Sequence, residues 1–185
     1  MDAEFQDLGS AEFASPLGTL SLVFAGETLV HLDFEGNEAR AAKQLIKRYP
    51  HRRIGARALP ESLHDPLQAY FAGFPAALDE VPCQLGGSPF QREVWRALRH
   101  VGPGSTSTYG ALATAVGKQP NACRAVGAAV GANPLALVIP CHRIVGANGR
   151  LTGYAGGLER KRWLLAHEGV TLQSDVERGQ GETDR

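Results

Sequence analysis

Residues 109–143 read YGALATAVGKQPNACRAVGAAVGANPLALVIPCHR, and this stretch decides the fold of the second half of the chain. It predicts two short helices, Tyr109–Val116 and Ala122–Val130, on either side of a tight connection at Gly117–Pro120. Asn121 stands where a residue would cap the second helix. Two short helices joined by a glycine-containing turn are typical of a helix-turn-helix, although many helical proteins contain such a pair.

The second helix of this pair carries almost no bulk. Apart from Arg124 and Asn133, residues 124–133 contain nothing larger than valine. Such a surface can approach a groove or another helix closely, and a close-packed core helix is the usual explanation. Arg124 at the start of the helix favours presentation to DNA instead.

The end of the stretch carries chemistry. We expect Leu135–Ile139 to form a buried strand, which the sequence PCHR at 140–143 follows directly. A thiol becomes nucleophilic only after losing its proton, which requires a nearby base or a positive field. His142 and Arg143 are candidates, and Glu168 lies far enough along the chain to fold back and orient a histidine. Spacing alone indicates a Cys/His hydrolase-like site, with plain packing of a buried cysteine as the competing interpretation.

Cysteine usage excludes two other kinds of site. Cys83, Cys123 and Cys141 are odd in number and irregularly spaced, so they predict no disulfide framework. No CxxC pair suggests a zinc cage. Each cysteine is therefore expected to be either a small buried residue or a reactive thiol.

A formal net charge of zero conceals an asymmetry along the chain. Residues 1–88 contain 7 Lys and Arg against 12 Asp and Glu, whereas residues 89–169 contain 10 against 3. Residues 170–185 are acidic again, with 2 against 4. A solvated basic face is one explanation, but the asymmetry favours an anionic partner for the second half.

The first half predicts a small sheet with helices. Turn, hairpin, helix and linker signals occur in the order turn at 15–18, strands at 19–24 and 28–34, helices at 37–49 and 66–71, and linker at 74–89. We therefore predict an α+β protein with an N-terminal domain at 1–85, a mostly helical DNA-binding domain at 86–169, and an acidic, disordered tail at 170–185. With no apolar run long enough to cross a membrane and no secretory signal, the expected location is the cytoplasm.

Six motifs then point to one family in their expected order. They are PFQ at 89–91, TYG at 108–110, RAVG at 124–127, VIPCHRIV at 138–145, GYAGGL at 153–158 and KRWLLAHEG at 161–169. Together they resemble the O6-alkylguanine-DNA alkyltransferases, also called methylated-DNA–protein-cysteine methyltransferases. The resemblance is dense over residues 89–169 and weak in the first half, where SPLG at 15–18 carries it.

The resemblance implies a direct-reversal repair reaction that consumes the protein. Cys141 would accept the alkyl group from O6 of guanine irreversibly, after His142 removes the thiol proton through a water molecule. Glu168 would orient His142, and Asn133 would support the hydrogen bonding of the site. Tyr109 would lie beside the flipped base and help to neutralise the departing guanine. The implied partner is double-stranded DNA carrying O6-alkylguanine, with O4-alkylthymine as a second candidate substrate, and the protein would act as a monomer.

The resemblance also implies the contacts to DNA. Arg124 would fill the hole that the flipped nucleotide leaves, while the small residues of its helix lie in the minor groove, namely Ala122, Ala125, Gly127, Ala128 and Gly131. The base pocket would consist of Tyr109 and the loop of Tyr154, Ala155 and Gly156, with the backbone at Cys141 and Ile144 also holding the base. Ala155 replaces a serine of some relatives, which removes a hydroxyl contact to O6. The residues that bind zinc in some relatives are missing, so we expect no metal and no cofactor.

Two other functions compete with this interpretation. A non-enzymatic, alkyltransferase-like lesion-binding protein would lack the acceptor cysteine, and Cys141 argues against it. A Cys/His hydrolase would need an oxyanion hole and an acyl substrate, and it would leave the basic half and the small-residue helix unexplained.

Overall fold

The computed structural model describes residues 7–172, and the expected acidic tail falls outside this range from residue 173 onward. In chain order the elements are β1 (Leu8–Ser15), β2 (Gly18–Ala25), β3 (Thr28–Phe34), α1 (Glu38–Arg48), β4 (Ile54–Ala56), α2 (Glu61–Phe71), η2 (Pro75–Glu80), α3 (Pro89–Arg99), β5 (Ser107–Thr108), α4 (Tyr109–Ala115), η3 (Pro120–Ala122), α5 (Cys123–Gly131), η4 (Cys141–Arg143), β6 (Ile144–Val145) and α6 (Leu158–His167), where η marks a short 3₁₀ helix. The predicted α+β class is confirmed.

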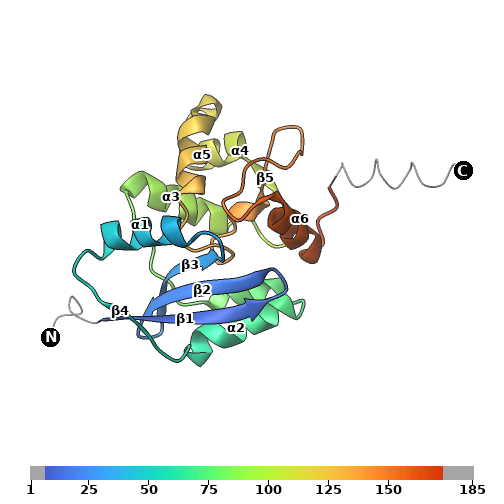
Figure 1. Ribbon diagram of the computed structural model, residues 1–185. Coiled ribbons are helices and arrows are strands. Elements are labelled where there is room, and N and C mark those ends of the chain that lie inside the picture. The colour runs from blue at the N-terminus through green and yellow to red at the C-terminus, as the bar shows by residue number, and fades with distance from the viewer. Residues whose placement is uncertain (1–6, 173–185) are drawn as a thin grey trace, which may run out of the picture.

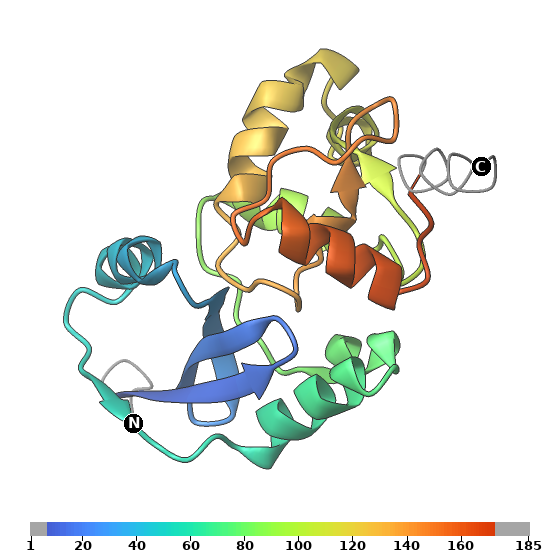
Figure 2. The same ribbon diagram turned by 45° about the vertical axis from the view of Figure 1, so that its right-hand side comes forward.

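The first half is built on a four-stranded sheet of order β3-β2-β1-β4. In both ribbon views α2 lies below this sheet, and α3 to α6 gather above it (Figures 1 and 2). The predicted hairpin is confirmed as β2 and β3, and the predicted helix at 37–49 as α1. No helix among the described residues is long and apolar enough to cross a membrane.

The local sequence does not predict strand β1. Its sequence, LGSAEFAS, is rich in small and polar residues that favour strands only weakly. It becomes a strand because it is flanked on both sides, antiparallel to β2 and parallel to β4. The turn at 15–18 joins it to β2, and Gly18 adopts a φ of +95°, which favours glycine.

Helix α3 connects the two halves and begins with a strong start signal. Ser88 and Gln91 form a reciprocal capping box, and Pro89 occupies the first helical position. The helix buries Val94, Trp95 and Leu98 in the core. Trp95 Nε1 donates a hydrogen bond of 2.8 Å to the carbonyl of Ala129, near the end of α5. This bond ties α3 to the second helix of the helix-turn-helix.

The expected buried strand at 135–139 is wrong, although the burial is correct. These five residues form a compact turn, with Leu137 at a φ of +68° and only an isolated bridge from Leu135 to Leu32. The side chain of Asn133 makes the turn possible. Its Oδ1 accepts from Leu135 N at 3.0 Å, and its Nδ2 donates to Ile139 O at 2.8 Å. Leu32 of β3 adds two backbone bonds, donating to Pro134 O and accepting from Ala136 N, each at 2.9 Å. The Asn133 side chain and this single bridge together satisfy the buried backbone groups, so no extended strand ladder forms.

Three boundaries also differ from the expectation. Asn121 does not cap α5, because Pro120 starts a 3₁₀ turn that runs directly into the helix, whose first flanking residue is Ala122. Helix α2 begins at Glu61, five positions before the predicted start. The predicted linker at 74–89 contains η2 and buries Leu78.

One hydrophobic core serves both halves. Its fully buried members include Leu32 and Phe34 from β3, Tyr70 from α2, and Trp95 from α3. It extends to Ile139, two residues before Cys141. The core contains residues from both sides of residue 85. The domain boundary near that residue stays a prediction.

Replacing Trp95 with Phe should test how strongly α3 holds α5. The variant leaves the core apolar but removes the donor to Ala129 and leaves a small void, so unfolding should become easier by about 1–3 kcal/mol. Urea unfolding monitored by circular dichroism measures this change. Trp163→Phe, at a half-buried position in α6, is the matched control. An equal loss in both variants would contradict a special role for the Trp95 hydrogen bond.

Candidate active site and DNA-facing helix

Cys141 lines a cavity between the two halves of the chain. The thiol residue is 8% exposed and begins the 3₁₀ turn η4. The cavity has a volume of about 330 Å³, which is within the usual range of small-molecule sites. Its other walls come from the first half, from α4 and α5, and from the loop before α6, namely Asp33, Arg40, Tyr109, Gly127, Val130, Gly131, Asn133, Ala136, Gly153, Tyr154, Ala155 and Gly156.

The thiol is buried but not isolated. Asn133 Nδ2 approaches Cys141 Sγ at 3.1 Å, within hydrogen-bonding distance. Burial raises the pKa of the Cys141 thiol, whereas the Asn133 hydrogen bond and the positive charges of Lys161 and Arg40 act in the opposite direction. Since burial dominates, the thiol needs a base to become a nucleophile.

A candidate base, His142, stands at the next position in the sequence. His142 is fully buried, and its Nε2 lies 2.8 Å from Glu168 Oε1. Burial lowers the pKa of His142, which favours the neutral ring. A carboxylate can only accept, so Nε2 carries the proton and Nδ1 is left with its lone pair. Nδ1 has no hydrogen-bond partner among the described residues, so it is available to accept a proton.

Glu168 is the fixed charge of the site. Its side chain is fully buried, and Arg143 binds it through Nε to Oε2 at 2.7 Å and through Nη2 to Oε1 at 3.0 Å. Burial alone would raise the pKa of Glu168, but hydrogen bonds from His142 and Arg143 lower it to about 2. The carboxylate therefore stays charged. Arg143, expected to provide a positive field for the thiol, instead points to Glu168 and to the carbonyl of Val101 at 2.6 Å.

The positive field comes from residues that sequence reasoning did not assign. Lys161 on α6 is fully buried, and its Nζ donates to Ile144 O at 2.5 Å and Thr152 O at 2.8 Å. Burial lowers its pKa to about 8, which the negative charge of a Cys141 thiolate counteracts. Lys161 belongs to the KRWLLAHEG motif, yet nothing in that motif indicates where its ammonium group points.

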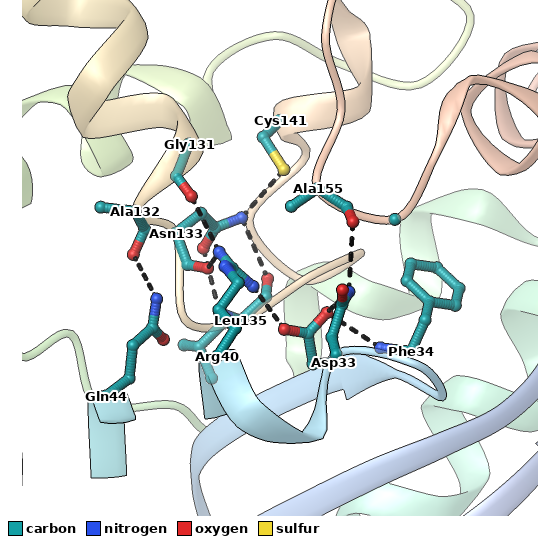
Figure 3. A network of polar contacts seen from close by, with 12 residues as sticks. Asp33, Phe34, Arg40, Gln44, Gly131, Ala132, Asn133, Leu135, Cys141 and Ala155 are labelled. Atoms are coloured by element: carbon teal, nitrogen blue, oxygen red, sulfur yellow. Dashed lines mark hydrogen bonds and ion pairs between the residues drawn. The ribbon is translucent and has the colours of Figure 1, made fainter. Parts of the chain in front are cut away.

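Figure 3 shows the second missed element, a polar network from the first half that holds the cavity walls. Arg40 forms an ion pair with Asp33, and its Nη2 donates to the carbonyls of Gly131 and Asn133, each at 2.8 Å. The C-terminal end of α5 is thus held by a cation, which also complements the helix dipole.

The same network reaches the opposite wall. Asn37 Nδ2 donates to Asp33 Oδ1 at 2.8 Å and to Ala155 O at 3.2 Å. The loop at 153–156 and the end of α5 are therefore both fixed by the segment from Asp33 to Arg40 (Figure 3). No sequence spacing indicates these contacts, since they join residues about a hundred positions apart.

Apart from Cys141, four of the five predicted pocket residues line the cavity, and one does not. Tyr109, Tyr154, Ala155 and Gly156 line the cavity, and the Tyr154 hydroxyl is buried without a partner among the described residues. Ile144 does not line it, because its side chain is buried in the core.

Helix α5 presents a narrow exposed stripe. Arg124, Ala125, Ala128 and Gly131 are exposed, and Ala122 is half-buried at the start of the helix. Gly127 faces inward, where a Cβ would lie 3.7 Å from the Tyr109 ring. The stripe therefore leads from Arg124 to the cavity mouth. Among residues 7–172, no group of three or more His, Cys, Asp and Glu could hold a metal ion.

A buried thiol thus shares a cavity with α5, the second helix of the helix-turn-helix, and an imidazole and a carboxylate lie buried behind it. Residues 89–170 match the family model described as 6-O-methylguanine DNA methyltransferase, DNA binding domain. The methylated-DNA–protein-cysteine methyltransferase of Salmonella typhimurium is 47% identical over 165 residues, covering 87% of this chain and 95% of that protein. The chain belongs to the methylated-DNA–protein-cysteine methyltransferase family.

Solved structures of relatives share the fold. The Mycobacterium tuberculosis protein OGT in complex with DNA aligns with a TM-score of 0.72 at 36% identity, covering 86% of this chain and 92% of that one. The O6-methylguanine-DNA methyltransferase from Pyrococcus kodakaraensis aligns with a TM-score of 0.69 at 26% identity, covering 88% of this chain and 99% of that one. The architecture of both halves is therefore that of the family.

Glu168 should make stability depend on acid. Its pKa lies near 2 in the folded protein, below the ordinary value of 4.5. Its stabilising effect is therefore complete above about pH 4.5 and is lost as the pH falls toward 2. Glu168→Gln should lower the free energy of unfolding by about 3 kcal/mol at pH 7, because Arg143 is also left without its counter-charge.

Urea unfolding at pH 7 and pH 3 measures this dependence. The difference between the wild type and Glu168→Gln should shrink at the lower pH. Glu159→Gln, at an exposed position on α6, is the control and should stay within roughly 0.5 kcal/mol of the wild type. A difference that is equally large at both pH values would contradict the assignment of the low pKa.

Proposed function

We propose that this protein repairs O6-alkylguanine in double-stranded DNA by moving the alkyl group irreversibly onto Cys141. One observation carries the proposal. The Cys141 thiol, backed by His142 and Glu168, lies in a cavity whose wall is the C-terminal part of α5, the second helix of a helix-turn-helix. A nucleophile placed there can meet a base only if the base leaves the DNA stack.

The chemistry follows from the order of the groups. His142 Nδ1 takes the thiol proton through a water molecule, and Glu168 stabilises the resulting imidazolium at Nε2. The thiolate of Cys141 attacks the alkyl carbon, so that a carbon–sulfur bond forms while the carbon–O6 bond breaks and its electrons pass to guanine.

The departing guanine anion then gains a proton, with Tyr109 at the cavity wall helping to neutralise it. The proton released by the thiol balances the one that guanine gains. A thioether has no easy route back, so each molecule acts once. Asn133 supports the reaction by directing its amide toward the sulfur of Cys141.

The DNA contacts follow from the shape of α5. A duplex cannot present O6 to a buried thiol, so the nucleotide must rotate out at a cost of a few kcal/mol. We place the exposed stripe of α5 in the minor groove, where its small residues permit close approach. Arg124 occupies the gap in the stack. The base enters between Tyr109 and the loop at 154–156.

Two further parts of the proposal concern the state of the protein. The protein would act as a monomer, because Cys141, Asn133, His142 and Glu168 already form a connected site within one copy and the reaction needs no second one. A reaction that needs a reduced Cys141 suits a reducing compartment such as the cytoplasm.

Mass spectrometry of the intact protein tests the reaction. After incubation with a duplex containing O6-methylguanine, the mass should rise by about 14 Da, the mass of one added methylene, because one thiol hydrogen is replaced by a methyl group. Cys141→Ala should show no increase, while Cys123→Ala, at the exposed thiol, should react like the wild type. An unchanged mass in the wild type, with the lesion still bound, would favour a lesion-binding protein. A methyl group found on Cys83 or Cys123 by peptide mapping would contradict the assignment of Cys141.

Arg124 should matter only when a base must leave the duplex. Lysine keeps the charge but loses the planar guanidinium that can stack on the orphaned base. Arg124→Lys should bind undamaged duplex nearly as well as the wild type but transfer alkyl groups from duplex DNA more slowly, and Arg124→Ala should be worse in both respects.

The free base O6-benzylguanine provides the control, because it needs no flipping. Both Arg124 variants should react with it at close to the wild-type rate in single-turnover measurements. If Arg124→Ala slows both reactions equally, Arg124 belongs to the chemical site or to the fold.

A further inference from the structure

Tyr70 reaches the buried carboxylate from the other half of the chain. Its hydroxyl donates a hydrogen bond of 3.0 Å to Glu168 Oε1, the same oxygen that lies 2.8 Å from His142 Nε2. Arg143 supplies the remaining hydrogen bonds to the carboxylate. His142 and Arg143 belong to the motif around the thiol, whereas Tyr70 lies on α2, 98 positions before Glu168.

The position of Tyr70 is fixed from several sides. The residue is fully buried, and its backbone carbonyl accepts a hydrogen bond of 2.7 Å from His167 Nε2. Its ring packs edge-on against Phe71 and lies 5.2 Å from the ring of His167, which stacks on Trp163. Helix α2 therefore binds two consecutive residues at the end of α6, His167 and Glu168. A hydroxyl held this way has little freedom to turn elsewhere.

The Tyr70 phenol can act only as a donor in this position. Burial raises its pKa well above 10, and the charge and hydrogen bond of Glu168 raise it further. The phenol therefore keeps its proton at every pH at which the protein works. A donor on a carboxylate withdraws negative charge from it, so Tyr70 weakens the attraction between Glu168 and the proton on His142.

We infer that Tyr70 is a positioning residue for alkyl transfer, which holds Glu168 in place and limits its basicity so that His142 stays neutral and ready to accept the thiol proton. This inference rests on the proposed function. It also gives the sheet-and-helix half a direct connection to the chemistry, beside the Asp33 and Arg40 network at the cavity walls.

The charged groups around the imidazole shift the pKa of His142 in opposite directions. Arg143, from the same turn as His142, and Lys161, from α6, both lower the pKa of His142, and Glu168 raises it. Because Tyr70 reduces the effect of Glu168, its removal should raise the pKa of His142. More of the base would then be protonated in mild acid, and the reaction would slow at a higher pH than in the wild type.

Tyr70→Phe tests this, because it deletes one oxygen and keeps the ring. Single-turnover transfer from a duplex containing O6-methylguanine should be followed from about pH 5 to pH 9. The acid limb of the rate profile should move upward by about 0.5–1 pH unit, while the plateau rate stays within about threefold of the wild type. Affinity for the duplex should not change, since Tyr70 is buried.

A control separates this effect from loosened packing. Trp163→Phe disturbs the same aromatic cluster through Phe71 and His167 without touching the hydrogen bond to Glu168. It should lower the melting temperature and leave the acid limb unmoved. An unchanged limb in Tyr70→Phe, or an equal shift in Trp163→Phe, would overturn the inference.

A second substitution predicts the opposite sign. Site-specific replacement of Tyr70 by 3-fluorotyrosine makes the phenol a stronger donor, so the acid limb should move to lower pH. This arm remains decisive even if Tyr70→Phe fails to fold, and a shift to higher pH would contradict the inference. Methyl transfer by the wild type, measured by intact mass, tests the proposed function separately, so failure of one is distinguishable from failure of the other.

Discussion

The buried carboxylate of Glu168 is the charge on which the rest of the structure depends. An ionised group in an apolar interior is costly unless hydrogen bonds and opposite charges compensate it, and removing one partner of such a pair is strongly destabilising. Here Arg143, His142 and Tyr70 all bind the same carboxylate. Since these partners come from η4 and α2, and Glu168 itself caps α6, the charge can be buried only if three distant segments meet. The fold must therefore bring these three segments together for Glu168 to lie charged beside His142.

The thiol depends on a second set of constraints. Burial shields Cys141 from water and raises its pKa, which would leave it inert without the neighbouring base. Asn133 and Lys161 favour the thiolate from two different directions. A protein that reacts once gains nothing from an exposed, permanently ionised cysteine, which other electrophiles would consume. A buried thiol that ionises only with the help of a base, the role proposed for His142, meets both demands.

The two halves are chemically interdependent. The segment from Asp33 to Arg40 holds both the end of α5 and the loop at Ala155, which line the same cavity. Tyr70 adds a hydrogen bond to the buried carboxylate of Glu168. Without these contacts, the second half would lose the hydrogen bonds that hold two walls of the cavity. It would also lose one hydrogen-bond donor to Glu168. The first half is therefore part of the machinery, although it carries neither the thiol nor the base.

The sequence by itself determined the elements whose signals are local. Alternation and turn residues predicted β2 and β3, helical spacing predicted α1, and the small-residue run with Arg124 predicted α5. The motif residues around Cys141 and Glu168 were predicted through family resemblance, and the structure brings them together.

Only the tertiary structure decided the features that depend on distant partners. Strand β1 is a strand because β2 and β4 flank it, and residues 135–139 are a turn because Asn133 and Leu32 of β3 satisfy their backbone. Arg143 was expected beside the thiol but pairs with Glu168, and Tyr70 carried no signal as an ordinary aromatic residue on an amphipathic helix. The physical reason is common to all of them. Local propensity and spacing act within a few residues, whereas the partner that satisfies a buried polar group can lie anywhere along the chain that the fold brings near.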